Sequence, residues 1–209
     1  MVAARILGIE QVVNMLARKE KDFVSVEDYL QSELIRDTKH ELVGGNIYAM
    51  AGASKNHERL SGNIYAEFRS HLQESSCETF SSDMKLKVGS NFFYPDVMVV
   101  CDDVSDNDYY VESPVIIVEV LSKSTRRIDE TIKLMSYINL ASVQEYVIIE
   151  QDIVDIQVLR RSESWLPKHY FLGDEVLFTS IDLLLSVEEI YHRVQNEDVA
   201  EFLMAKSIL

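Results

Sequence analysis

The sequence predicts an α/β fold in which helices flank a mixed β-sheet, and three hydrophobic patterns indicate it. Apolar residues at four-residue spacing predict one long helix from about Lys55 to about Gln73. This stripe consists of Leu60, Ile64, Phe68 and Leu72. Residues 83–88 alternate strictly between apolar and polar side chains, which is typical of a strand. Residues 115–121 are almost continuously apolar, as expected of a central strand that is buried on both faces.

The segment before the long helix predicts a short helix and a hairpin. Ser25 and Asp28 fit a capping pattern, so we expect a helix to begin at Ser25. Gly44 and Gly45 lie between two apolar runs, which predicts a tight turn between two strands.

Further strands and helices are predicted on either side of residues 115–121. A strand is expected from Tyr94 to Cys101 and a helix from about Thr125 to about Asn139. Two more strands and a possible edge strand follow, at residues 145–150, 153–160 and 176–178. Residues 187–194 are expected to form a closing helix.

The composition is that of a globular protein with one main domain. The 209 residues are 47% hydrophobic and 26% charged. We expect residues 23–195 to form this domain, with an N-terminal helical extension in residues 1–22 and a C-terminal helical tail in residues 196–209. No apolar run reaches the roughly 20 residues of a membrane helix, and the N-terminus does not resemble a signal peptide. We therefore expect a cytoplasmic protein with no membrane partner, in which Cys77 and Cys101 are reduced thiols.

The net charge of −15 argues against a strong, general affinity for DNA. Proteins bind DNA without sequence preference mainly by neutralising its phosphates with lysine and arginine. A nucleic-acid site on this chain therefore requires a local basic patch, a bound metal ion or oligomerisation.

Two carboxylates stand out because of the residues around them. Glu119 lies among aliphatic residues, where an unpaired charge is very costly unless a partner or a metal ion compensates it. Asp96 follows Pro95 and opens a second apolar run. If the two runs form adjacent strands, both carboxylates reach one ion. Magnesium prefers oxygen ligands and retains several waters, so one or two carboxylates suffice to bind it.

The motifs around these two acids resemble the bacterial Uma-type family of restriction-endonuclease-like proteins, in the PD-(D/E)XK nuclease superfamily. The resemblance runs from about Val24 to about Val194. Its motifs are Pro95-Asp96, Glu119-Val-Leu-Ser122, Thr125, Asp129, Lys133 and Tyr137. It also includes Glu41-Leu-Val-Gly-Gly-Asn46, the helix of His57 and Glu145-Tyr-Val-Ile148. The resemblance implies a restriction-endonuclease-like mixed β-sheet flanked by helices. It also implies a site that hydrolyses phosphodiester bonds in nucleic acid, with DNA favoured, and that uses Mg²⁺ or Mn²⁺.

The same resemblance assigns roles to four residues. Asp96 and Glu119 are expected to bind the metal and to be catalytic, and Glu41 is expected to be a third metal ligand. The superfamily pattern has a lysine two residues after the second acid, but this chain has Leu121 there. The resemblance favours Lys133, on the following helix, as the catalytic lysine.

Simpler interpretations stay open for several of these residues. Lys123, in the loop after Glu119, is an alternative catalytic lysine. Asp96 alone could be a turn residue after proline. Lys133 could form only a solvent-exposed helix pair with Asp129. His57, near the start of a helix, could contact phosphate, but a capping or surface role is favoured.

Three hypotheses about function follow. The first is a metal-dependent endonuclease, and the second is a weak or inactive relative that acts in binding or assembly. The second hypothesis is motivated by Leu121 and by the negative charge. The third is hydrolysis of a phosphate ester other than nucleic acid. A homodimer is possible, with the N-terminal helix and the segment around Phe202, Leu203 and Met204 as candidate contacts.

Overall fold

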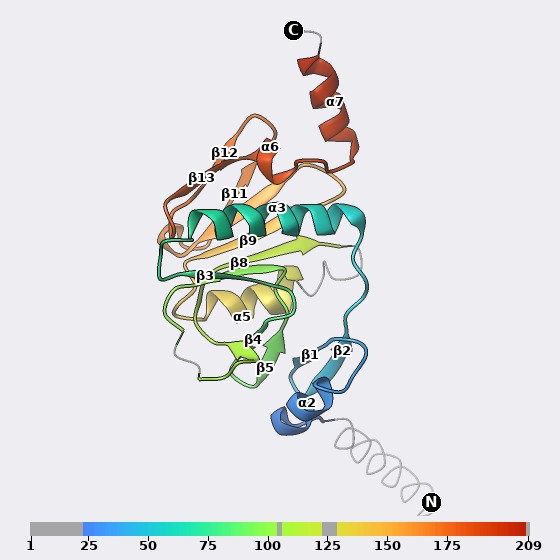
Figure 1. Cartoon of the computed structure of the whole chain (residues 1–209), viewed down its shortest axis with the longest axis vertical. Helices are drawn as coiled ribbons and strands as arrows, with labels where there is room; N and C mark the ends of the chain where they lie inside the picture. Colours follow the sequence, from blue (N-terminus) through green and yellow to red (C-terminus); the bar gives the residue numbers. More distant parts are fainter. Residues whose placement is uncertain (1–22, 104–105, 123–128, 208–209) are drawn as a thin grey trace, which may run out of the picture. The chain divides into compact units, whose positions relative to one another are not determined.

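The computed structural model of the chain describes residues 23–103, 106–122 and 129–207 (Figure 1). The chain divides into two compact units. The first comprises Met1–Met50 with Gly89–Phe92, and the second comprises Ala51–Val88 with Phe93–Leu209. The predicted helix of residues 1–22 lies outside the described residues, and the domain bounds at residues 23 and 195 stay a prediction. No helix in the described part is long and apolar enough to cross a membrane.

The first unit contains the predicted short helix and hairpin. Helix α2 (Val26–Glu33) begins after Ser25, whose Oγ accepts a hydrogen bond from the backbone N–H of Asp28 at 3.1 Å. Strands β1 (His40–Val43) and β2 (Asn46–Ala49) pair in antiparallel orientation. Their turn consists of Gly44 and Gly45 with φ of 56° and 77°, values that glycine adopts without strain. Strand β5 (Asn91–Phe93) pairs with β1 on the other side.

The second unit is built around a six-stranded sheet in the order β11-β10-β9-β8-β6-β3. The strands are β3 (Glu78–Ser81), β6 (Val97–Val100), β8 (Pro114–Leu121), β9 (Glu145–Glu150), β10 (Ile156–Arg160) and β11 (Pro167–Tyr170). Strands β8 and β9 are parallel, and every other neighbouring pair in this sheet is antiparallel. The predicted mixed sheet is therefore confirmed.

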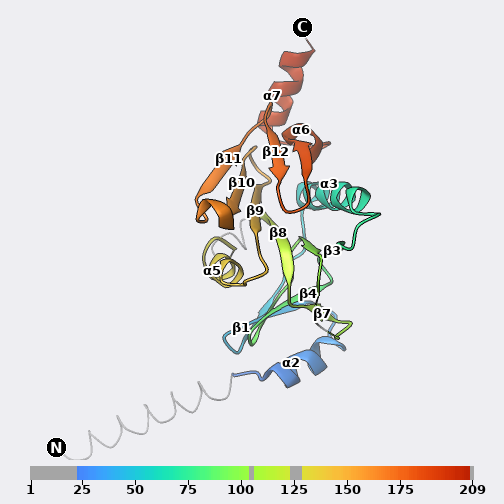
Figure 2. The same cartoon turned by 90° about the vertical axis from the view of Figure 1, so that its left-hand side faces the viewer.

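Helices cover both faces of this sheet, as Figure 2 shows for α3 (Lys55–His71) and α5 (Leu134–Ile138). The predicted stripe of α3 is buried in the hydrophobic core together with Val118 and Val120 of β8. Alternate residues of β8, including Glu119, therefore point to the opposite face, which α5 covers. A π-helical turn, Asp129–Lys133, leads directly into α5. The first residues of the helix predicted from Thr125 lie outside the described part.

Smaller elements complete the second unit. They are the parallel pair β4 (Lys85–Val88) and β7 (Tyr110–Val111), the hairpin β12 (Glu175–Phe178) and β13 (Leu183–Ser186), the 3-10 turn Arg161–Glu163, α6 (Val187–Ile190) and α7 (Glu197–Lys206). The strand predicted from Tyr94 begins only at Val97. The closing helix predicted to reach Val194 ends at Ile190, and Arg193 adopts a φ of 63° that no right-handed helix contains.

The two cysteines form a disulfide bond, which corrects the prediction that both are reduced thiols. The sulfur atoms of Cys77 and Cys101 are 2.02 Å apart. The cysteines flank the paired residues Glu78 and Val100, where β3 and β6 run antiparallel. They therefore lie opposite each other on neighbouring strands. The sequence separation of 24 residues did not reveal this arrangement.

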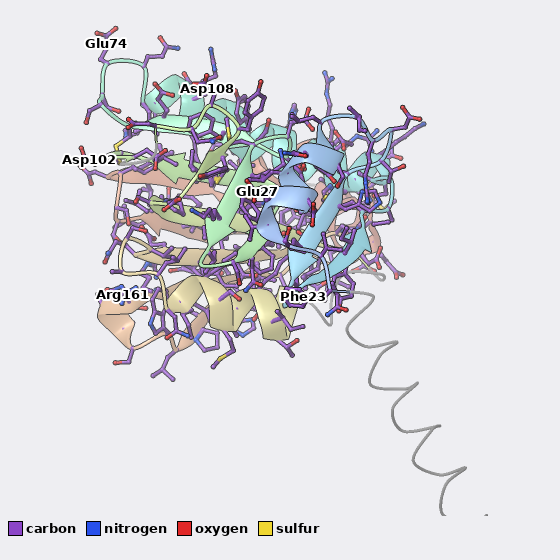
Figure 3. All side chains as sticks on the ribbon, turned by 90° about the horizontal axis from the view of Figure 1, so that it is seen from below. Phe23, Glu27, Glu74, Asp102, Asp108 and Arg161 are labelled. Carbon is purple, nitrogen blue, oxygen red and sulfur yellow. A yellow bond between two sulfur atoms is a disulfide. The ribbon has the colours of Figure 1, made fainter. Side chains whose placement is uncertain are left out.

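The acidic residues after β6 lie on the surface. Asp102, Asp103, Asp106 and Asp108 are exposed. Figure 3 shows the side chains of Asp102 and Asp108 extending outward. This agrees with a loop whose charges are hydrated by solvent.

Candidate active site

Asp96 and Glu119 come together on neighbouring strands of the six-stranded sheet. In the antiparallel register of β6 and β8, Val97 is opposite Val118, so the next positions outward are Asp96 and Glu119. A hydrogen bond joins Asp96 to the residue that follows Glu119, because the backbone N–H of Val120 donates to Oδ2 of Asp96 at 2.7 Å. The adjacency expected from the two apolar runs is therefore present in the structure.

Glu119 is compensated by two donors that arrive from one helix. The residue is only 3% exposed. Oε1 accepts hydrogen bonds from Nζ of Lys133 at 3.1 Å and from the hydroxyl of Tyr137 at 2.9 Å. Lys133 ends the π-helical turn and Tyr137 lies one turn further along α5, so both reach the same carboxylate. This arrangement permits a buried carboxylate in an otherwise aliphatic strand.

Lys133 is not the solvent-exposed surface lysine of the simpler interpretation, because it is 4% exposed and paired with Glu119. Leu121, at the position where the superfamily has lysine, is buried in the apolar interior. The ammonium group of Lys133 thus reaches the acid from the helix instead of from the strand. Lys123 lies outside the described residues, so the choice between the two lysines rests on this contact and on the family pattern.

His57 reaches the site from the start of α3. Its Nε2 lies 3.3 Å from Oδ2 of Asp96, and its side chain is mostly buried. Its backbone N–H donates to Oγ of Ser54, the N-cap of α3, at 3.1 Å. The backbone of His57 therefore takes part in the helix cap, as the capping interpretation expects. Its imidazole, in contrast, contacts Asp96, a predicted site residue. The sequence signals for His57 were its position near a helix start and the place of its helix within the family resemblance.

A second connection joins the start of α3 to the end of β8. Oγ of Ser54 donates to Oε1 of Gln151 at 2.5 Å, and Nε2 of Gln151 donates to the carbonyl of Leu121 at 2.6 Å. Gln151 is buried and follows β9 directly. Sequence reasoning did not single out Ser54 or Gln151, because their partners are distant along the chain.

Glu41 lies on β1 of the first unit, where it pairs with Tyr48 of β2. Its side chain is buried. Its expected role as a third metal ligand stays a prediction.

The chemistry of the site fits a magnesium or manganese ion that retains several waters. Asp96 and Glu119 supply hard carboxylate oxygens, which these ions prefer. Within the described residues, Oδ1 of Asp96 takes part in no hydrogen bond or ion pair. The same residues contain no cluster of three or more histidine, cysteine, aspartate or glutamate side chains arranged for a metal. The ion would therefore depend on two carboxylates of this unit and on water.

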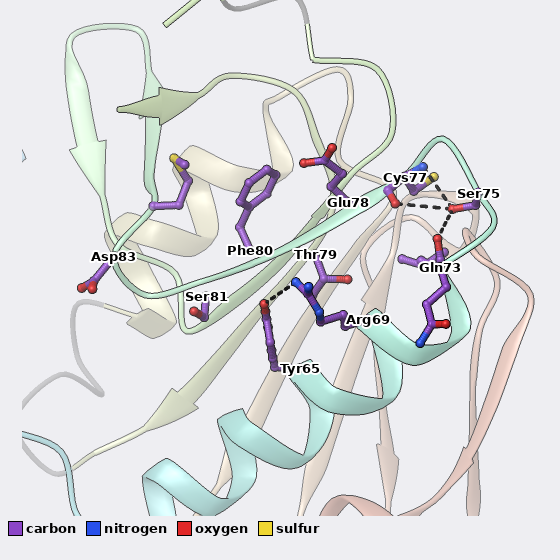
Figure 4. A pocket seen from close by; sticks show the side chains of 12 residues that line it. Tyr65, Arg69, Gln73, Ser75, Cys77, Glu78, Thr79, Phe80, Ser81 and Asp83 are labelled. Atoms are coloured by element: carbon purple, nitrogen blue, oxygen red, sulfur yellow. Dashed lines mark hydrogen bonds between the residues drawn. The ribbon is translucent and has the colours of Figure 1, made fainter. Parts of the chain in front are cut away.

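A separate surface pocket of about 680 Å³ lies between α3 and the edge strand β3 (Figure 4). It is lined by Tyr65, Arg69, Thr79, Phe80 and Asp83, among others. Figure 4 shows Arg69 donating to the hydroxyl of Tyr65, at 3.1 Å. None of the candidate site residues lines this pocket, so it is distinct from the carboxylate pair.

Comparisons with known proteins agree with the fold and with the resemblance in the motifs. The sequence model of a family described as "Putative restriction endonuclease" matches residues 26–188. An uncharacterized protein of Synechocystis sp. is 35% identical over 173 residues, which are 80% of this chain and 91% of that protein. A second one is 36% identical over 133 residues, which are 61% of this chain and 75% of that protein.

A solved structure has the same fold. It is the crystal structure of a "putative nuclease belonging to DUF820" from Anabaena variabilis, with a TM-score of 0.69 and 14% sequence identity. The match covers 82% of this chain and 99% of that one. At this identity the likeness establishes the fold alone.

Proposed function

This chain belongs to the family described as "Putative restriction endonuclease", and we propose that it is a metal-dependent endonuclease. The proposed reaction is hydrolysis of a phosphodiester bond in nucleic acid, with DNA favoured as substrate. The proposed metal is Mg²⁺ or Mn²⁺. Asp96, Glu119 and Lys133 are the proposed catalytic residues, and Glu41 is the proposed third metal ligand.

The single observation that carries the proposal is the contact between Lys133 and the buried Glu119 beside Asp96. A purely structural role would not require a carboxylate in this aliphatic strand, because an aliphatic side chain would fill the position at lower cost. A lysine and two carboxylates in one place are the groups that phosphodiester hydrolysis uses. The family membership points to the same chemistry.

In the proposed mechanism, Asp96 and Glu119 would hold the ion through their carboxylate oxygens. The ion would supply a water of lowered pKa and positive charge that stabilises the reacting phosphate. Lys133 orients the attacking water and offsets the negative charge that develops on the phosphate oxygens. Tyr137 fixes Glu119 through Oε1 and so keeps the carboxylate in place. Attack of water on phosphorus breaks one P–O bond, which leaves a phosphate on one cut end and a hydroxyl on the other.

The test is cleavage of DNA and RNA by the purified protein in Mg²⁺, in Mn²⁺ and in EDTA. Asp96→Asn, Glu119→Gln and Lys133→Met remove one proposed group each, and we expect each to lower the cleavage rate by about 100-fold or more. Glu67→Gln is the matched control, because Glu67 is an exposed carboxylate on α3. It should cleave like the wild type. Cleavage that survives both acid substitutions contradicts the assignment.

The second candidate function is a weak or inactive member that acts in binding or assembly. The observation that favours it is the buried Leu121 at the position of the superfamily lysine. Titration calorimetry separates the two candidates. A chain that binds neither Mg²⁺ nor Mn²⁺ at millimolar concentration has no working metal site, whereas the endonuclease proposal requires binding.

The homodimer and the cytoplasmic location also stay predictions. Disulfides are rare in cytosolic proteins of mesophiles, so the Cys77–Cys101 bond argues against a reducing compartment. Sedimentation of the purified chain tests the dimer. Cell fractionation with thiol labelling tests the location and the redox state together.

A further inference from the structure

We propose that His57 is a positioning residue that orients the carboxylate of Asp96, so that Oδ1 is the oxygen presented to the metal ion. The proposal rests on the proposed function, because it concerns the same metal site. It assigns to His57 a role different from the cap or the phosphate contact that the sequence suggested.

The first step is the unequal use of the two carboxylate oxygens of Asp96. Oδ2 accepts the backbone N–H of Val120 at 2.7 Å and lies 3.3 Å from Nε2 of His57. Among the described residues, Oδ1 has no such contact. A carboxylate held by one contact can still rotate about its last side-chain torsion, which has a broad energy profile. Two contacts on the same oxygen restrict that rotation and leave Oδ1 for the ion.

The second step is that His57 is itself held in place. Its backbone N–H donates to Ser54, and Ser54 donates to Gln151. Gln151 in turn donates to the carbonyl of Leu121, two residues after Glu119. The contacts therefore form a closed ring from β8 through the start of α3 and back to β8 at Val120. The imidazole position is thus set by the same strand that carries Glu119.

The third step is that His57 is poorly placed to be a metal ligand. Its Nε2 faces Oδ2 of Asp96, and its Nδ1 is fully buried. In metal sites, a carboxylate that binds the metal is commonly hydrogen-bonded by a further side chain, which fixes its orientation without binding the metal itself. His71, at the other end of α3, is a histidine that does not contact Asp96. Its Nε2 lies 2.7 Å from the carbonyl oxygen of Ile181.

The experiment measures Mn²⁺ affinity by titration calorimetry on the full chain and its variants. His57→Ala removes the contact, and His57→Phe removes it while keeping a ring, in case the alanine variant does not fold. We expect both to raise the Kd for Mn²⁺ about 10-fold to 100-fold, the usual range for residues that support a ligand. His57→Gln places an amide N–H near the position of Nε2 and should restore most of the affinity. His71→Ala is the control and should leave the Kd unchanged.

Spin-echo spectroscopy of bound Mn²⁺ distinguishes positioning from direct coordination. We expect no nitrogen coupling in the wild type, and the same spectrum in His57→Gln. Nitrogen coupling that disappears in His57→Gln would make His57 a ligand and overturn the proposal. An unchanged Kd in folded His57→Phe also overturns it while leaving the metal site intact. A wild type that binds no Mn²⁺ removes the metal site itself, and the proposal with it.

Discussion

Tyr137 supports Glu119 through a single hydroxyl, and that contact predicts a measurable cost. The ring of Tyr137 packs edge-on against Phe93 and Tyr146, with ring centroids 5.4 Å apart in both pairs. Tyr137→Phe keeps this packing and removes only the donor to the buried carboxylate. We expect the free energy of unfolding to fall by about 1.5–3 kcal/mol, the usual value for a hydrogen bond to a charged group.

Urea unfolding in EDTA measures this effect without a contribution from metal. Tyr65→Phe is the control, because its hydroxyl only accepts a bond from Arg69 in a partly exposed place. Its effect should stay within about 0.5 kcal/mol. Equal effects of the two substitutions would mean that Tyr137 does not support Glu119.

Glu145 shows that burial alone does not identify a catalytic acid. It is 0% exposed, more buried than Glu119, and it also begins an apolar strand. Its Oε1 accepts bonds from Ser180 N–H and Oγ, both at 2.7 Å, and Oε2 accepts Nε of Arg160 at 3.3 Å. Because fixed donors from neighbouring segments occupy both of its oxygens, we assign Glu145 a structural role.

Arg160 shares this network. Burial acts to lower the pKa of Arg160, but its hydrogen bond to Tyr170 and the nearby charges raise the pKa above its usual value. Glu145→Gln leaves the guanidinium buried with no countercharge on this side. We expect a loss of about 3–5 kcal/mol in the free energy of unfolding, as for other broken buried pairs.

The control for this prediction is Glu163→Gln. Glu163 also pairs with Arg160, at 3.6 Å, but its side chain is 49% exposed. An exposed ion pair contributes about 0–1 kcal/mol. Mn²⁺ affinity should be unchanged in both variants, and a weakened Mn²⁺ affinity in Glu145→Gln would contradict the structural role.

At the scale of elements, the disulfide joins β3 to β6, the strand that leads from Asp96. Its cysteines are 24 residues apart, so in the loop-entropy account the bond restricts the unfolded chain. We expect reduction to lower the free energy of unfolding by about 3 kcal/mol. Urea unfolding with and without a reductant measures this difference.

The double variant Cys77→Ser and Cys101→Ser is the control, since its stability should not respond to the reductant. Mass spectrometry of the oxidised protein after proteolysis should find the two cysteine peptides joined. Free thiols at both positions after purification without a reductant would contradict the bond.

The topology of β6, β8 and α5 explains how the two acids and the lysine meet. Antiparallel pairing aligns Asp96 with Glu119, and the parallel step from β8 to β9 requires a crossover. The crossover contains the turn that ends at Lys133. Lys133 therefore reaches Glu119 from the helical segment that covers the sheet. In the superfamily pattern, the lysine instead lies on the strand, at the position of Leu121.

At the scale of the whole molecule, the charge of −15 predicts weak binding of DNA in the absence of metal. Asp96→Asn and Glu119→Gln each remove one negative charge from the site. We expect both variants to bind a DNA duplex more tightly than the wild type in EDTA, although neither cleaves it. Fluorescence anisotropy of a labelled duplex measures the affinity, with Glu67→Gln as a control for net charge.

The salt dependence of binding adds a second measurement. If few lysine and arginine side chains contact phosphate, the slope of log K against log salt should be no steeper than about −3. A much steeper slope would reveal an extensive basic surface, contrary to the composition. Binding in EDTA that is lower in Asp96→Asn than in the wild type would contradict the repulsion argument.

The local sequence pattern was sufficient to predict many of the helices and strands of this protein. The strand at residues 145–150, the stripe of α3 and the Gly44-Gly45 hairpin form where the sequence predicts them, because each depends on burial or backbone freedom encoded within a few residues. Strands β3, β5, β7, β11 and β13 were missed. Each is only two to four residues long, which is too short for an alternating pattern to be recognised.

Glu119 could be singled out as a candidate site residue from the sequence alone, because a carboxylate within an aliphatic run is costly to bury without a partner. Only the tertiary structure decided which groups contact the two acids. Lys133 donates to Oε1 of Glu119, and both His57 and the N–H of Val120 contact Oδ2 of Asp96. The tertiary structure likewise decided the disulfide between Cys77 and Cys101. The physical reason is that hydrophobic periodicity specifies which side chains are buried. Strand register and helix packing determine which buried groups meet, and these depend on segments far apart in the chain.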